Sequence, residues 1–377
     1  MIKIENPDLA NIAEEYFTRI KDHCKKRADF FLTVLNVLFA GAPAADMINF
    51  KLHGGTKKSL CNLLLRVKLG KNPNYRNVIA GNCHQWVRNK QAILDRIAVH
   101  LADDNNLRDL ILVRPEDSYR KDRDLKIHFI TTTRRHITDI YSFINKIIDY
   151  SIFDNHAYWL GTKLNINTCP YCNRSYIHTV IDKNRKEIIR PTFDHFFPQS
   201  RHPFLSLSFY NLIPSCYYCN SSLKTATIIT PDTHLHPYLD GFGDDARFKI
   251  LIAANKPQRS DPENYSIWLQ EFITDLSPKY RQVFGKNANE GNVNLFQLNE
   301  IFLSHRDVVG ELVVKCDKYS GGYADSLHRI FGHLNTNKGE FYQFYFGNYF
   351  NEKDFHRRPL AKMTKDIIRQ VLPAFVK

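Results

Sequence analysis

Apolar and charged positions alternate at helical spacing over most of the first 160 residues. Three segments place apolar side chains three or four positions apart with charged residues between them, namely 11–39, 84–103 and 136–156. This spacing puts the apolar residues on one face and is typical of amphipathic helices. The stretches 68–77 and 113–124 are rich in turn-forming and charged residues and are interpreted as loops. The pattern predicts a helical domain over residues 1–160.

Between residues 161 and 240 the pattern changes to short runs of β-branched and aromatic residues. Runs at 175–181 and 187–193 flank the polar sequence DKNRK, which predicts a β-hairpin. The sequence TFDH is interpreted as the end of a strand, NLIPSC as a second short strand, and CNSSLKTA as the start of a helix. These elements predict a small module of mixed structure.

Helical spacing returns beyond residue 240, where helices are expected at 262–276, 299–316 and 359–372. The fold class that follows is α+β. A small module at 161–240 is set between the helical domain at 1–160 and a mainly helical C-terminal region at 241–377.

Positive charge is concentrated rather than spread along the chain. The formal net charge is +13. Residues 51–100 hold ten Lys or Arg and one acidic residue, Asp95, which gives a net of +9, and residues 351–377 contribute a net of +4. A concentrated basic segment suits a polyanion such as nucleic acid. A solvated basic face and a contact with an acidic protein are the alternatives that the charges leave open.

The sequence predicts neither a membrane span nor a secretion signal. The most apolar early run, residues 30–45, is interrupted by polar residues and Pro43, and is shorter than the roughly 18–20 apolar residues that a span needs. The first residues are acidic and polar, unlike a secretory leader. We therefore expect a cytoplasmic protein, in which the eight cysteines serve as thiols or metal ligands rather than disulfides.

Two Cys-x-x-Cys pairs carry the strongest local signal. Cys169 and Cys172 lie in CPYCN, and Cys216 and Cys219 lie in CYYCN. Two such pairs supply the four thiolates of a tetrahedral structural zinc site. A redox motif is expected in a βαβ context, which the sequence does not show. The other alternative is two unrelated pairs of buried thiols. One shared zinc ion would close the intervening residues into a loop and supply much of the folding energy of the module.

Within this loop and at its rim lie an acid, an imidazole and two amides: Asp194, His195, Asn211 and Asn220. Adjacent strand residues point to opposite faces, so either a twist or bulge helps Asp194 and His195 to converge on one ligand or the two residues serve different roles. Oxygens of Asp194 and Asn220 suit Mg²⁺ or Mn²⁺, which would stabilise charge on a phosphate. A neutral His195 could take a proton from the attacking water, and Asn211 could hold the His195 loop by hydrogen bonds. Together these roles describe phosphodiester hydrolysis.

The sequence FDHFFP…NLIPSCYYCNSSLK, preceded by CPYCN, resembles the HNH endonucleases, also called the ββα-metal or His-Me finger group, in their zinc-containing subtype. By position, the resemblance makes Asp194 and Asn220 the ligands of the catalytic metal. It makes His195 the general base and Asn211 the residue that orients it. The third motif carries Asn220, where the family has either His or Asn. The resemblance covers residues 169–225 and leaves the rest of the chain unexplained.

Further candidates lie close to these motifs. Lys224 and Arg174 are candidates for binding substrate phosphates, with a solvated surface position as the alternative for Arg174. His234 and His236 either line the active cleft or belong to a structural turn.

The resemblance also implies a biological setting. HNH proteins with large flanking regions are similar to effectors of bacterial anti-phage defence systems, including Septu-like and retron-linked ones, in which a separate ATPase or regulatory protein controls the nuclease. The expected substrate is nucleic acid, DNA before RNA. The alternative from another class is a non-catalytic zinc-dependent nucleic-acid-binding or scaffold protein.

Overall fold

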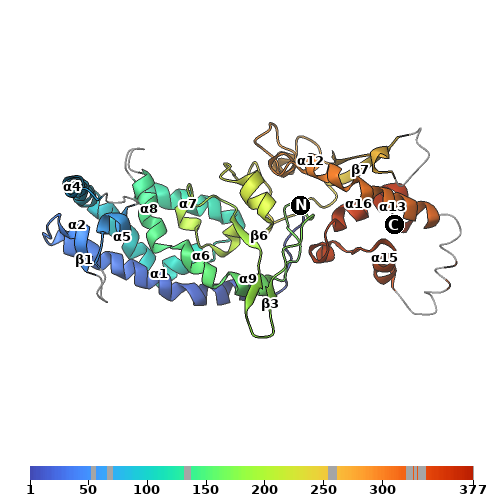
Figure 1. Ribbon diagram of the computed structural model, residues 1–377. Helices are drawn as coiled ribbons and strands as arrows, with labels where there is room; N and C mark the ends of the chain where they lie inside the picture. Colours follow the sequence, from blue (N-terminus) through green and yellow to red (C-terminus); the bar gives the residue numbers. More distant parts are fainter. Residues whose placement is uncertain are drawn as a thin grey trace. The chain divides into compact units, whose positions relative to one another are not determined.

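The chain divides into two compact units that alternate along the sequence. The computed structural model describes residues 1–51, 57–65, 71–130, 137–253, 261–319, 326, 329 and 337–376 (Figure 1). We call one unit the helical unit, which comprises residues 8–160 and 195–212. The other is the cysteine unit, which comprises residues 1–7, 161–194 and 213–377. The segment 195–212, predicted as part of the small module, therefore packs with the helices.

The helical unit consists almost entirely of helices in the part of the chain that the structure describes. Its helices and strands are α1 (Leu9–Phe39), α2 (Asp46–Asn49), β1 (Phe50–Lys51), β2 (Lys57–Lys58), α3 (Leu60–Leu64), α4 (Pro73–Asn89), α5 (Gln91–Ala102), α6 (Asp104–Ile111), α7 (Pro115–Phe129), α8 (Ile137–Ile147) and α9 (Ala157–Leu164), the last continuing into the cysteine unit. Short 3-10 helices follow at Tyr150–Asn155, Pro203–Leu205 and Phe209–Asn211.

Helix α1 is the longest element and packs against α5, α6 and α8. Its buried residues include Tyr16, Ile20, Phe31 and Leu38, which recur on one face as the sequence predicts. The helix predicted at 84–103 is two helices, because the chain breaks between α4 and α5 at Lys90. The segment predicted at 136–156 becomes α8 followed by a 3-10 helix.

The prediction of a loop at 113–124 is wrong, because α7 occupies most of this stretch. Proline at the first helical position and two acidic residues in the first turn favour a helix start. The buried positions Ser118, Asp122, Leu125 and Phe129 form one stripe at helical spacing. Two members of this stripe are polar, so a search for apolar residues at helical spacing does not detect this helix.

The loop predicted at 68–77 also needs correction from Pro73 onward, where α4 begins. Asn72 caps this helix by accepting a hydrogen bond from the backbone N–H of Asn74. Residues 68–70 lie outside the described residues, as do two cations of the basic segment, Arg66 and Lys68.

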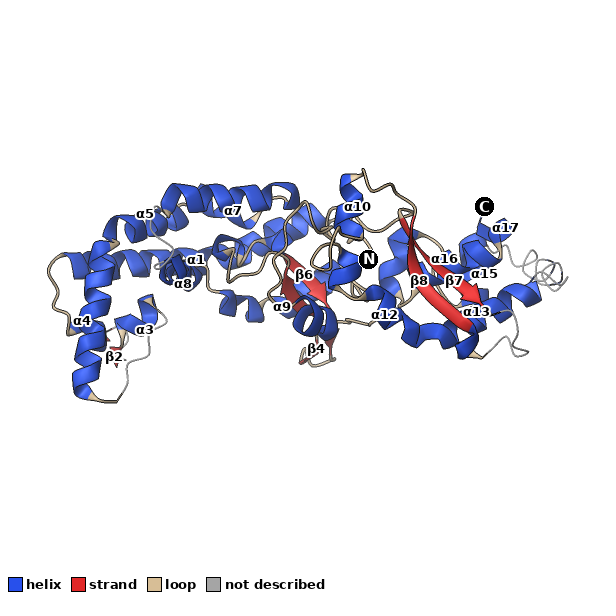
Figure 2. Cartoon of the chain, turned by 90° about the horizontal axis from the view of Figure 1, so that it is seen from above, coloured by secondary structure: helices blue, strands red, loops and turns tan. Residues whose placement is uncertain are grey.

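The cysteine unit combines short two-stranded sheets with helices (Figure 2). Its elements are β3 (Val180–Ile181), β4 (Glu187–Ile189), β5 (Thr192–His195), β6 (Leu212–Ser215), a π-helix (Tyr218–Lys224), β7 (Ala246–Ile252), β8 (Tyr265–Glu271), α10 (Pro278–Val283), α11 (Asn292–Leu295), α12 (Leu298–Phe302), α13 (Arg306–Lys318), α15 (Lys338–Phe346), α16 (Ala361–Val371) and α17 (Pro373–Val376). The last residue of β5 and the first of β6 belong to the helical unit.

Strands β3 and β4 pair antiparallel around the DKNRK turn, which confirms the predicted hairpin. Strands β5 and β6 form a separate pair, which confirms the two strands predicted around Asp194 and after Asn211. The helical segment that follows β6 is a short π-helix that ends at Lys224, where Thr225 takes a positive φ of 48°.

The helix predicted at 262–276 is wrong, because this stretch contains strand β8. Strand β8 pairs antiparallel with β7, with Ile250 opposite Ile267. Tyr265, Ile267 and Leu269 are buried while the residues between them are exposed. This period of two is the signature of a half-buried strand. The sheet packs on α16, α12 and α13, so the described part of the C-terminal region combines one strand pair with its helices.

No described helix has both the length and the apolar character that crossing a bilayer requires.

Candidate metal centre and nuclease site

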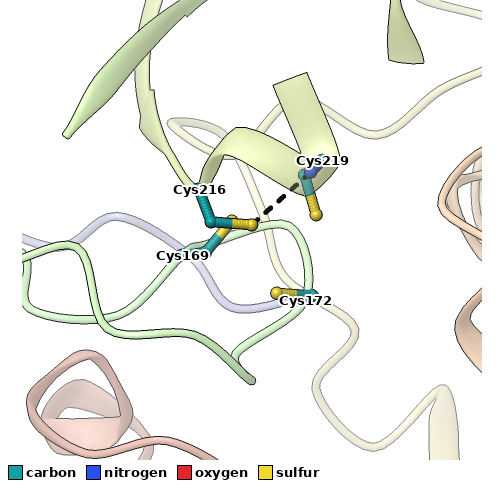
Figure 3. Close-up of side chains that lie close together, drawn as sticks. All are labelled: Cys169, Cys172, Cys216 and Cys219. Carbon is teal, nitrogen blue, oxygen red and sulfur yellow. Dashed lines mark hydrogen bonds between the residues drawn. The ribbon is translucent and has the colours of Figure 1, made fainter. Parts of the chain in front are cut away.

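The four predicted zinc ligands come together in the cysteine unit. The sulfur atoms of Cys169, Cys172, Cys216 and Cys219 all lie within 4.8 Å of one another, and all four residues are buried. Figure 3 shows their side chains converging from a loop and from the start of the π-helix. Tetrahedral zinc with Zn–S bonds of about 2.3 Å places its sulfurs about 3.8 Å apart, close to this arrangement. The cluster is therefore suited to one structural metal ion such as zinc.

Each Cys-x-x-Cys turn is called a knuckle here, the first at Cys169–Cys172 and the second at Cys216–Cys219. Both knuckles have the local backbone geometry that favours thiolate ligands. The N–H of Arg174 donates to Sγ of Cys172 at 3.4 Å, and the N–H of Cys219 donates to Sγ of Cys216 at 3.5 Å. Asn173, directly after Cys172, has a φ of 50°, a conformation that Asn tolerates better than most residues. This turn directs the backbone N–H of Arg174 back toward the sulfur of Cys172.

The pKa values of the buried thiols in the cluster are shifted in opposite directions. Burial raises the pKa of the Cys169 thiol well above its usual value. Hydrogen bonds from the neighbouring thiols, that of Cys169 first, lower the pKa of Cys216. A divalent cation neutralises such a set, since thiolates rather than thiols are the metal ligands.

Asn173 joins the first knuckle to the C-terminal region. Its side chain donates to the backbone carbonyl of Phe355 at 2.9 Å and accepts from the N–H of Lys362 at 3.1 Å. Its carbonyl accepts from the N–H of Leu360 at 2.6 Å, so it satisfies donors at the start of α16. Part of the role of residues 241–377 is thus to support the cysteine cluster, which the sequence did not reveal.

Asp194, the proposed metal ligand, lies in the interior of the cysteine unit with a side chain only 3% exposed. Its Oδ1 accepts from Nζ of Lys224 at 3.0 Å, and its Oδ2 accepts from the hydroxyl of Tyr171 at 2.6 Å. Tyr171 lies between the first two cysteines and stacks on Phe296. Both carboxylate oxygens are therefore engaged by groups of the protein itself.

Lys224, the candidate for contacting a substrate phosphate, is buried, with a side chain 1% exposed, and its role with phosphate stays a prediction. The π-helix that carries it starts at the second cysteine pair and turns the lysine toward Asp194. Asn220, on the same helix, is half-buried, and no side-chain hydrogen bond links it to another described residue. The two residues assigned as metal ligands thus differ sharply in their surroundings.

A divalent cation at Asp194 requires Lys224 to move away, because two cations within about 4 Å repel each other strongly in a poorly solvated site. The oxygen donors of Asp194 and Asn220 have the right chemistry for Mg²⁺ or Mn²⁺. The arrangement in the structure satisfies the carboxylate with lysine instead.

His195 lies in the helical unit and is partly buried. Its Nε2 lies 2.8 Å from the carbonyl oxygen of Ser206, and its ring centroid lies 4.4 Å from that of Tyr150. A carbonyl only accepts, so Nε2 carries a hydrogen, and in the neutral form of the ring the lone pair is on Nδ1. This tautomer and a fixed ring orientation are what a general base needs.

Asn211 is hydrogen-bonded to the segment that follows His195. Its Oδ1 accepts from the N–H of Phe197 at 2.8 Å, and its Nδ2 donates to the carbonyls of Phe197 and Leu205 at 3.2 and 2.9 Å. Because Phe197 is two residues after His195, these bonds fix the start of the loop that follows the histidine. The catalytic role assigned to this residue stays a prediction.

The helices contribute a second anchor for the same loop, which sequence reasoning missed. Nδ1 of His202 lies 2.7 Å from a carboxylate oxygen of Asp122, a buried residue of α7. The hydroxyl of Ser206 donates to Oδ1 of Asn145 at 2.8 Å. No local pattern announces these pairs, because their partners lie about sixty to eighty residues apart.

The other candidates lie in different surroundings. Arg174 is half-buried beside the first knuckle, and its Nε is buried without a hydrogen-bond partner among the described residues. His234 is 1% exposed and lies 2.9 Å through Nδ1 from the hydroxyl of Thr233. Burial, followed by the charge of Lys224, lowers the pKa of His234 to about 4. Within the basic segment Lys71, Arg88 and Arg96 are exposed, and their role with nucleic acid stays a prediction.

Comparison with known proteins gives no match: no family model, no curated protein and no solved structure resembles the chain at a significant level.

Proposed function

We propose that the protein is a zinc-stabilised, metal-dependent HNH endonuclease that hydrolyses phosphodiester bonds of DNA or RNA. The observation that carries the proposal is the buried four-cysteine cluster, whose two halves bracket the chain segment containing Asp194, His195 and Asn211. Strand β5, strand β6 and the π-helix follow one another in the order strand, strand, helix. This order supports the resemblance.

In this proposal His195 takes a proton from the water that attacks the phosphorus. Its hydrogen bond to the carbonyl of Ser206 sets the tautomer, and Asn211 holds the adjoining loop. A positioned general base of this kind contributes about 10² to 10⁴ in rate. The chemistry needs Asp194 and His195, which are neighbours in the sequence, to act on the same phosphodiester.

Asp194 and Asn220 would hold Mg²⁺ or Mn²⁺, which supplies charge stabilisation at the phosphate and the leaving oxygen when it is bound. Because Lys224 neutralises Asp194 in the structure, we infer that the lysine and the metal compete for the same carboxylate. In this proposal Lys224 limits metal binding by occupying Asp194 and does not contact the phosphate.

A defence effector is the setting that this proposal favours, with a separate ATPase or regulatory protein as partner. Its support is the resemblance together with the large flanks, which hold the basic segment 51–100. Phosphate contacts by such a segment give salt-dependent binding with little sequence preference.

The deciding experiment is cleavage of labelled single-stranded and duplex DNA and RNA by zinc-loaded protein with Mg²⁺ or Mn²⁺. Wild type should cleave at least one substrate, and His195→Ala should lose about 100-fold or more of the rate. His128→Ala, at an exposed histidine of α7, is the matched control and should keep full activity. Equal rates for wild type and His195→Ala would show that the activity is not of this site.

One observation favours a second function, a non-catalytic zinc-dependent nucleic-acid-binding or scaffold protein. Asp194 is fully paired with Lys224 and Tyr171, as a structural carboxylate would be. This reading predicts no cleavage of any substrate and retained nucleic-acid binding in the same assay.

A further inference from the structure

A groove of about 450 Å³ lies in the cysteine unit beside the second cysteine pair. Residues from the hairpin side of the groove include Tyr176, His178 and Arg190, and residues from the knuckle side include Tyr217 and Tyr218. Neither the zinc cluster nor the catalytic assignment uses these side chains. The groove is therefore a feature that still needs a function.

The aromatic rings in the groove are unusually accessible for residues of their size. Tyr176 is 52% exposed, Tyr217 is 64% exposed and Tyr218 is 59% exposed. Tyr176 already stacks on His178, with ring centroids 4.5 Å apart and an interplanar angle of 24°. A pair of flat rings held nearly parallel at a surface is a platform on which another flat ring can continue the stack.

The chain segment that forms the hairpin side of the groove has a net positive charge, and Arg190 of this segment lines the groove. Residues 174–190 contain five Lys or Arg and two acidic residues. One of the two acidic residues is Asp182. Its Oδ1 accepts hydrogen bonds from the backbone N–H groups of Asn184 and Lys186 in the hairpin turn. Exposed aromatic rings interleaved with cations suit a ligand that presents both flat bases and phosphates.

We propose that this groove binds the unstacked bases of a single-stranded nucleic acid. Bases inside a duplex are already stacked on each other and cannot lie on a tyrosine ring, so the groove favours single strands. The proposal rests on the proposed nuclease function and narrows its substrate class.

The position of the groove fits delivery of the strand to Asp194, the proposed ligand of the catalytic metal. Thr192 of β5 and Ser215 of β6 line it, and Thr192 is two residues before Asp194 on the same strand. Residues i and i+2 of a strand lie about 7 Å apart on one face. One nucleotide spans a comparable distance along a strand, so a base held against Thr192 lies about one nucleotide's length from Asp194.

The zinc cluster and the groove are also coupled through the chain. Tyr217 and Tyr218 are the two residues between Cys216 and Cys219. Binding of a metal by both cysteines fixes the backbone that carries the two rings. Base binding therefore depends on the metal even though the metal does not touch the base.

The test is fluorescence anisotropy with a labelled thymidine oligonucleotide of about 12 residues, a length within the range of known single-strand sites. The protein is full-length His195→Ala, zinc-loaded and without added Mg²⁺, so that no cleavage occurs. Tyr217→Ala and Tyr218→Ala should each weaken binding about tenfold. Tyr217→Phe, which keeps the ring, should bind within about twofold of the parent protein.

Phe344→Ala is the matched control, since Phe344 of α15 is 64% exposed and lies outside both the groove and the basic segment 51–100. Zinc content, measured in every sample, separates loss of the rings from loss of the fold. A self-complementary duplex should bind less tightly than the single strand and should be insensitive to Tyr217→Ala. If the single strand binds equally to the parent protein and both alanine variants, or does not bind at all, the inference is overturned and the groove is left for a protein partner.

The outcomes also separate this inference from the proposed nuclease function. Tyrosine-dependent binding by a wild-type protein that cleaves nothing would support the groove and contradict the nuclease. Cleavage by wild type that Tyr217→Ala and Tyr218→Ala leave unchanged would do the reverse.

Discussion

The ammonium of Lys224 lies 3.0 Å from Oδ1 of Asp194, and neither side chain is more than 3% exposed. The pair joins the π-helix after β6 to strand β5, across thirty residues of sequence. Buried lysine is rare unless it is paired, so this contact is a specific feature of the fold. It places a fixed cation at the carboxylate that the sequence assigns to a metal ion.

Breaking the pair should cost more stability than a surface substitution does. Lys224→Met removes the cation and leaves the Asp194 charge buried beside Tyr171, and we expect a loss of about 3–5 kcal/mol in the free energy of unfolding. Urea denaturation measures it. Adding Asp194→Asn to Lys224→Met should recover most of the loss. A single variant as stable as wild type would show that the ion pair does not hold this part of the unit together.

The four-cysteine cluster predicts that removal of a single cysteine sulfur abolishes zinc binding. Wild-type protein should hold about one zinc ion per chain, and Cys216→Ser should lose it together with stability and cleavage. Cys316→Ser is the matched control, because Cys316 is equally buried but lies outside the cluster. Both changes bury a hydroxyl and lower stability for that reason alone, so zinc content, measured by atomic spectroscopy, and cleavage are the readouts that distinguish them. Full zinc loading and activity in Cys216→Ser would contradict the shared site.

Asn220 should be required for activity but not for the fold. Its half-buried side chain makes no hydrogen bond to another described residue, so Asn220→Ala should change the free energy of unfolding by less than about 0.5 kcal/mol. Cleavage with Mg²⁺ or Mn²⁺ should nevertheless be lost. Thermal unfolding and the cleavage assay, run on the same preparation, check both halves. An active Asn220→Ala protein would remove this residue from the metal site.

Protonation of His234 should lower the stability of the folded protein as the pH falls through a defined range. Burial lowers its pKa from 6.5 to about 4, so the unfolded chain takes up a proton more readily than the folded one. The stabilisation is complete above pH 6.5 and is lost as pH falls from there toward 4. Between pH 7.5 and 5 this one group should cost about 2 kcal/mol. His234→Gln should therefore lose less stability than wild type over that interval, and equal losses would contradict the buried neutral imidazole.

Local sequence was sufficient for the features that depend on spacing along the chain. The two cysteine pairs, the DKNRK hairpin and strands β5 and β6 are each specified by a few consecutive residues. Helix α7 was missed because its buried stripe contains Ser118 and Asp122, which an apolar pattern ignores. Strand β8 was missed because its apolar residues are also compatible with a helix until the partner strand β7 is known.

The buried polar pairs that involve Lys224 and Asp122 could not be predicted from the sequence. A lysine is expected at the surface, so the burial of Lys224 against Asp194 contradicts its default position. The same holds for Asp122, whose partner His202 belongs to the loop after His195. Such pairs become visible only when the fold brings distant segments together, and here they decide how the candidate site is held.

The most direct test of the account is the rate of cleavage against added Mg²⁺ or Mn²⁺, with zinc measured in the same samples of wild-type protein. Zinc-loaded protein should cleave nothing without the added cation and should reach a saturating rate with it, while its zinc content stays constant. Lys224→Met, if it remains folded, should saturate at a lower concentration of cation, because nothing then competes for Asp194. Fully zinc-loaded wild type that cleaves no DNA or RNA at any concentration of either cation would contradict the assignment of an HNH nuclease.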